Sequence, residues 1–101
     1  MVRPSILFTL LALAAVPVQA RDDIPYVGTW NCEVATFVFT ADTYDAGEGP
    51  MPILKSVEDN GTHTLTFKDD YQIHLSSVTE TDMDWLSGAS GDGFHCKRVS
   101  D

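Results

Sequence analysis

Three histidines, two cysteines and many carboxylates are the side chains in this sequence that could do chemistry. His63, His74 and His95 could bind a metal ion or act as general bases, and Cys32 and Cys96 could form a disulfide or supply a thiolate. Which of these roles is possible depends on the residues that the fold brings together.

The pattern of residues 62–75 separates two of the histidines. Apolar and polar residues alternate on either side of a short acidic turn, which predicts an antiparallel hairpin. Its register pairs His63 with Leu75 and Thr64 with His74. Successive side chains point to opposite faces of a sheet, so the two imidazoles cannot share a metal ion.

Catalytic residues are not evident elsewhere. His95 points away from Cys96 on its strand, and no carboxylate is spaced to orient any of the histidines. Asp82 and Asp84 share a strand face and could form an acid–base pair, although exposed strand acids explain them more simply. With no nucleophile–base set in view, we expect a protein that is not an enzyme.

Two further motifs have simple explanations. Asp42, Asp45 and Glu48 lie among glycines but lack the spacing of a known calcium loop. The stretch Asn60-Gly61-Thr62 fits a glycosylation sequon, yet Asn-Gly is also the strongest short signal for a type I′ hairpin turn. We therefore expect no metal ion and no cofactor.

The loop of residues 87–94 is the segment that we expect to carry function. It is rich in glycine and serine, and binding residues concentrate in such loops when a rigid sheet supports them. The candidate binding residues are Ser87, Ser90, Asp92 and Phe94. A plain hairpin connection is the alternative.

Residues 1–20 predict a cleavable signal peptide. Arg3 precedes the apolar run 6–16, and small residues end the segment at Ala20. The run is about half the length of a membrane-spanning helix, so an uncleaved anchor is the less favoured alternative. We expect a single domain over residues 21–101, periplasmic or secreted and with no membrane attachment.

Export and charge limit the partners. The chain carries a net charge of −9, and removal of the signal peptide takes away one basic residue and no acids. An acidic surface repels nucleic acid and anionic lipid and favours encounter with a cationic protein.

An oxidising compartment also predicts a Cys32–Cys96 disulfide, which would stabilise this small domain by roughly 4 kcal/mol. If the two cysteines face each other on neighbouring antiparallel strands, Trp30 falls opposite Arg98. The guanidinium could then stack on the indole ring.

Strand signals dominate the chain, and they predict an all-β antiparallel meander or closed barrel of seven to eight strands. Residues 46–52 read as a loop, and an eighth strand could lie in the segment 42–48. The seven clear strand candidates cover residues 26–34, 36–40, 53–57, 62–67, 71–75, 81–86 and 94–99.

Gly28-Thr29-Trp30, with Arg98 placed to cover the tryptophan, resembles the signature of the calycins, the superfamily that contains lipocalins and avidins. The resemblance implies a barrel whose end is closed by the Trp and the Arg. Ala89-Ser90-Gly91, followed by Phe94, resembles the Ser-Gly loop of the small periplasmic inhibitors of c-type lysozyme. In that family the loop inserts into the cleft of the enzyme.

The sequence thus predicts an exported binding module, with inhibition of a cationic hydrolase such as a lysozyme as the first hypothesis. A secreted effector or envelope protein that recognises a partner by its surface is one alternative. A carrier of a small apolar ligand in the barrel interior is another.

Overall fold

The computed structural model describes residues 24–99, so the predicted signal peptide lies outside the described residues. Within this range the chain forms nine β-strands and one 3₁₀ turn, η4 (Lys68–Asp70). The strands are β1 (Gly28–Asn31), β2 (Thr36–Phe39), β3 (Thr43–Asp45), β4 (Pro50–Pro52), β5 (Lys55–Asp59), β6 (Thr62–Thr66), β7 (Gln72–Ser76), β8 (Asp82–Ser87) and β9 (Gly93–Arg98).

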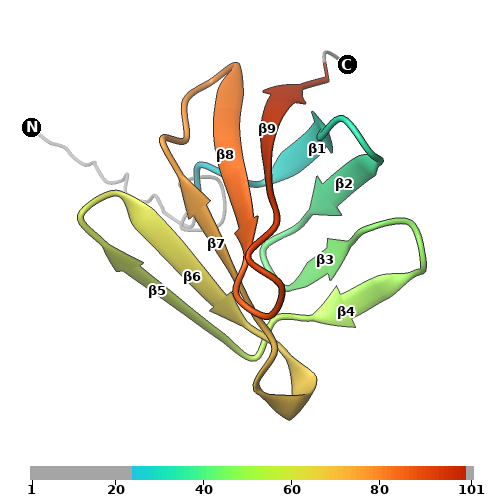
Figure 1. Cartoon of the computed structure of the whole chain (residues 1–101), viewed down its shortest axis with the longest axis vertical. Coiled ribbons are helices and arrows are strands. Elements are labelled where there is room, and N and C mark those ends of the chain that lie inside the picture. Colours follow the sequence, from blue (N-terminus) through green and yellow to red (C-terminus); the bar gives the residue numbers. More distant parts are fainter. Residues whose placement is uncertain (1–23, 100–101) are drawn as a thin grey trace, which may run out of the picture.

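All nine strands belong to one antiparallel sheet in the order β4-β3-β2-β1-β9-β8-β7-β6-β5. Figure 1 shows the sheet curled into a half-barrel, with β1–β4 on one side, β5–β7 on the other and β8 and β9 between them. The all-β prediction is confirmed. The closed barrel of seven to eight strands is wrong, because there are nine strands and no ladder joins β4 to β5 in the described sheet.

The edge strand β4 explains both errors. It lies in the segment that reads as a loop by composition, and two of its three residues are the prolines Pro50 and Pro52. Proline has no backbone N–H and is therefore tolerated only at the edge of a sheet. β3, in contrast, lies inside the 42–48 segment, which the sequence left open as the place of an eighth strand.

The chain crosses from one edge of the sheet to the other between β4 and β5. The Ile53 N–H donates to the Asp42 carbonyl at 2.8 Å, on the β3 side, and the Leu54 N–H donates to the Thr66 carbonyl at 2.8 Å, on the β6 side. β4 and β5 are thus successive parts of one extended segment. The first part pairs only with β3 and the second part only with β6.

The concave side of the half-barrel is filled by aromatic and aliphatic side chains from most of the strands. Alternation places these side chains inside, as expected from the period of two. The buried apolar residues are Tyr26, Trp30, Cys32, Phe37, Phe39, Tyr44, Leu65, Phe67, Ile73, Leu75, Met83, Trp85 and Cys96. Within residues 24–99 we find no helix of the length and apolarity that crossing a membrane requires.

One end of the half-barrel is held by contacts between the first and last strands, and we call it the closed end. The disulfide joins Cys32 to Cys96, and Trp30 pairs with Arg98 in the ladder, as predicted. The Arg98 guanidinium carbon lies 4.2 Å from the centre of the Trp30 ring. Gly28 has a φ of +143°, and a Cβ there would lie 2.5 Å from Arg98 Nη1, so the arginine needs a glycine at this position.

The predicted hairpins on the other side are also confirmed. Asn60 and Gly61 have φ values of 53° and 86°, which suits a type I′ turn between β5 and β6. β6 and β7 pair in the expected register, with His63 opposite Leu75 and Thr64 opposite His74.

Candidate functional site

The loop between β8 and β9 is anchored at its base. Ser87 is 5% exposed, and its hydroxyl accepts hydrogen bonds from the N–H groups of Ala89 at 3.2 Å and Ser90 at 3.3 Å. The Gly88 N–H donates to the Gln72 carbonyl of β7 at 2.9 Å. A Cβ on Gly88 would lie 3.0 Å from that carbonyl, so the close approach of loop and strand favours glycine.

The tip of the loop is exposed, yet its polar groups are bonded within the loop. The Ser90 hydroxyl donates to Asp92 Oδ2 at 3.1 Å and accepts from the Asp92 N–H at 3.2 Å. The Ser87 N–H donates to the Asp92 carbonyl at 2.8 Å, and the Gly91 N–H donates to the Ser87 carbonyl at 3.0 Å. The tip therefore has a defined conformation, which reduces the entropy that a partner would have to remove on binding.

The four predicted binding residues divide into two pairs. Ser90 and Asp92 are exposed at the tip, where a partner could touch them. Ser87 is buried, and Phe94 is half-buried and stacks on Trp85 with ring centres 5.4 Å apart. Ser87 and Phe94 hold the loop, and Ser90 and Asp92 are the side chains that it presents.

A second polar cluster lies on the outer face of β8 and β9, and the sequence did not predict it. His95 Nδ1 lies 2.9 Å from Asp84 Oδ1, and His95 Nε2 lies 3.0 Å from Asp82 Oδ1. Lys97 Nζ donates to the same Asp82 oxygen at 2.8 Å. The carboxylate of Glu33 accepts the His95 backbone N–H at 3.1 Å.

These contacts overturn the expectation that no carboxylate is placed to orient a histidine. The contacts also shift two pKa values. Hydrogen bonds to Asp84 and, second, to Asp82 raise the pKa of His95 above its usual 6.5. Hydrogen bonds from Lys97, Thr81 and His95 hold the pKa of Asp82 well below its usual range. An imidazole must be protonated to donate from both nitrogens. The two carboxylates, one at each ring nitrogen, therefore favour the protonated form of His95.

The signal for this cluster was present in the sequence. Asp82 and Asp84 alternate on β8, and His95 and Lys97 alternate on β9, so all four point outward. The ladder pairs Asp84 with His95 and Asp82 with Lys97. Only the register across the 87–94 loop was needed to find them.

The other two histidines lie apart, on different faces of the sheet as predicted. The His63 ring packs edge-on against Tyr26 with ring centres 5.3 Å apart, and His74 Nδ1 lies 2.9 Å from the Thr64 hydroxyl. The Asp45 carboxylate accepts the N–H groups of Gly47 and Gly49, at 2.7 and 3.2 Å. In the described range, no three His, Cys, Asp or Glu residues are placed to hold a metal ion.

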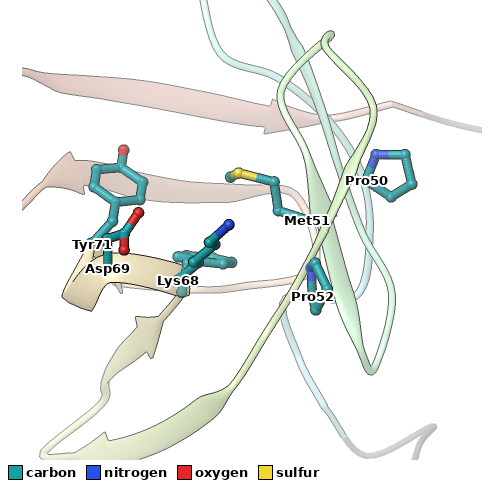
Figure 2. A pocket seen from close by; sticks show the side chains of 7 residues that line it. Pro50, Met51, Pro52, Lys68, Asp69 and Tyr71 are labelled. Atoms are coloured by element: carbon teal, nitrogen blue, oxygen red, sulfur yellow. The ribbon is translucent and has the colours of Figure 1, made fainter.

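A pocket of about 460 Å³ opens beside the edge strand β4. Its lining is mainly apolar, and Figure 2 shows it between β4 and the turn η4. The lining residues are Pro50, Met51, Pro52, Phe67, Lys68, Asp69 and Tyr71.

Comparisons with known proteins found no match to this chain. No protein-family model matches the chain, and no match was found among curated proteins or among solved structures.

Proposed function

We propose that this chain is an exported protein-binding module that captures a cationic protein, such as a lysozyme or another cationic hydrolase, through the β8–β9 loop. The observation that carries the proposal is the loop itself, an exposed tip held rigid by its own hydrogen bonds. Such loops bind with little loss of conformational entropy.

Charge supports the same kind of partner. The chain has a net charge of −9, and Asp92 adds an acid at the tip of the loop. Asp69 and Asp70 lie on η4, the turn that leads into β7, and β7 is the strand to which the loop is bonded through Gly88. A cationic surface would be steered toward this end of the molecule and would meet the tip first.

The resemblance of Ala89-Ser90-Gly91 to the Ser-Gly loop of lysozyme inhibitors supports a hydrolase as the partner. A hydrolase cleft is concave, and a narrow rigid loop can enter it. Disulfides persist in oxidising compartments, so the Cys32–Cys96 bond supports a place of action outside the cytoplasm, either periplasmic or secreted.

The test is a binding titration against a panel of cationic hydrolases that includes a c-type lysozyme, at low and at high salt. We expect binding that weakens with salt, an approximately tenfold loss on Asp92→Asn, and a roughly fivefold loss on Ser90→Ala.

Asp59→Asn is the matched control, because it removes the same charge from an exposed residue of β5 far from the loop in sequence. We expect it to change affinity by less than about twofold, as a distant exposed charge should. Equal losses for Asp59→Asn and Asp92→Asn, or no binding to any member of the panel at low salt, would refute the proposal.

A further inference from the structure

The pocket beside β4 results from the way the half-barrel fails to close. β4 lies at a free edge, and the segment that faces it is η4 and the residues around it, not a strand. Of the three residues of β4, only Met51 has a backbone N–H, so a ladder across the gap would lack donors. The gap is therefore lined by side chains.

The walls of the pocket are suited to a flat apolar molecule. Tyr71 forms an aromatic wall with the buried Phe67 ring packed against it, ring centres 5.8 Å apart, and Met51 of β4 lies on the opposite side. Figure 2 shows the Met51 side chain directed from β4 across the pocket. A volume of about 460 Å³ lies in the range of sites for small molecules.

Lys68 is the one basic residue that lines this pocket. Figure 2 shows the Lys68 side chain extending toward Met51, and Asp69 is the one acid among the lining residues. No ion pair joins Lys68 to an acid of residues 24–99, in contrast to Lys97, which is bonded to Asp82. The Lys68 ammonium is thus available to an anionic group on a bound molecule.

We propose that this pocket binds a compact aromatic molecule that carries one anionic group. Its rings pack between the Phe67–Tyr71 wall and Met51, and its anion pairs with Lys68. A peptide added as a strand is disfavoured, because the prolines deprive the β4 edge of N–H donors. The proposal is independent of the β8–β9 loop and of its partner.

The test uses two fluorescent dyes with the same aromatic body. Anilinonaphthalene sulfonate carries one anion, and phenylnaphthylamine is its uncharged counterpart. We expect the sulfonate to bind more tightly, and Lys68→Met to weaken it roughly fivefold while changing phenylnaphthylamine by less than about twofold. Lys55→Met is the matched control, since Lys55 is an exposed lysine that does not line the pocket.

Two of the three methionines, Met51 and Met83, locate the dye in the protein without substitutions. Met51 lines the pocket, whereas Met83 is fully buried in the core. We expect the NMR signal of the Met51 methyl to shift with the sulfonate dye while that of Met83 stays in place. Tyr71→Ala should weaken both dyes about tenfold, because it removes half of the aromatic wall.

Several results would overturn the proposal. They are equal or tighter binding of the uncharged dye, equal effects of Lys68→Met and Lys55→Met, or a shift of Met83 without Met51. A Met51 signal that moves with protein concentration in the absence of dye would assign the pocket to a second copy of the chain, which also contradicts a small-molecule site. Since the methyl shifts need no substitution, poor folding of Tyr71→Ala would leave the test intact.

Discussion

Trp30 and Trp85 are both buried, yet their indole N–H groups have opposite surroundings. Trp30 Nε1 donates to the Tyr26 carbonyl at 2.9 Å, and the Arg98 guanidinium covers its ring. Trp85 Nε1 lies near the Tyr44 hydroxyl but makes no hydrogen bond of good geometry, and the Trp85 ring packs against Phe94 and against Phe37, the latter with ring centres 5.3 Å apart. Burial alone does not distinguish these two environments.

The environment of Trp30 extends through Arg98 to the rest of the closed end. The arginine donates to the backbone carbonyls of Glu80 at 2.7 Å, and of Val27 and Pro25 at 2.8 Å each. One side chain thereby ties together the segment before β1, the turn before β8 and the last strand. Trp85 itself is held by ring packing, and the hydrogen bonds of the neighbouring 87–94 loop stay within the loop or reach β7.

Hydrogen bonds at the closed end join three separate segments of the chain, whereas those of the 87–94 loop lie within the loop or join it to β7. A buried polar group without a well-formed hydrogen bond costs about 1–3 kcal/mol, so we expect the Trp85 N–H to contribute less to the free energy of unfolding than the Trp30 N–H. The following predictions test this contrast in order of expected effect.

The largest effect is expected at the disulfide. Replacing Cys32 and Cys96 together by alanine should lower the free energy of unfolding by about 4 kcal/mol, since the bond closes a loop between residues 64 apart in sequence. Urea unfolding of both forms measures it. A loss below about 1 kcal/mol would mean that the closed end does not hold most of the stability.

The two tryptophans provide the most direct comparison. Trp30→Phe should lower the free energy of unfolding by about 2 kcal/mol more than Trp85→Phe, because it leaves the Tyr26 carbonyl unpaired and weakens the cation–π contact. Trp85→Phe removes an N–H that makes no well-formed hydrogen bond, with only the Tyr44 hydroxyl nearby to be affected. Urea unfolding of the two variants under the same conditions measures the difference, and equal losses would contradict the contrast.

A pair of glycines provides a smaller test. Gly28→Ala should cost about 2 kcal/mol, since the new Cβ clashes with Arg98 and the residue has a positive φ. Gly91→Ala should cost about 1 kcal/mol, because φ is +80° but no atom lies within 4 Å of the new Cβ. Thermal unfolding of the two variants measures the difference, and a cost for Gly91→Ala equal to or above that for Gly28→Ala would show that contact with Arg98 adds nothing.

The smallest effect is expected on the outer face, where the His95 cluster belongs to neither end. NMR titration should give a His95 pKa above 6.5, and Asp84→Asn should bring it back toward that value. Because folding raises this pKa, the stabilisation is complete below pH 6.5 and is lost as the pH rises through the folded value. An unchanged His95 pKa in Asp84→Asn would assign the shift elsewhere.

Much of the sheet could be predicted because side-chain alternation and local turn chemistry determine it. The Asn60-Gly61 turn and the pairing of Trp30 with Arg98 need only a period of two and one fixed pair of neighbours. The glycine- and serine-rich composition identified Ser90 and Asp92 as loop residues but could not tell them from the anchors Ser87 and Phe94. Burial depends on the rings that pack beneath the loop.

The features that escaped prediction depend on contacts between segments. β4 contains two prolines and is a strand only because β3 supplies its partners. The pocket exists because η4 faces β4 without pairing. The His95 cluster depends on the register of β8 with β9, which the length of the loop between them does not determine by itself. Whether the barrel closes likewise depends on the two edge strands, β4 and β5, together.

The disulfide also determines how the protein would carry a mechanical load. It joins Cys32, just after β1, to Cys96 in β9, so residues 32–96 form a covalent ring, with β1 and the end of β9 outside it. A pull applied to the two termini passes through the sulfur–sulfur bond and does not stretch the ring. Both the β8–β9 loop and the pocket lie within that ring, so tension on the chain ends would leave their geometry intact.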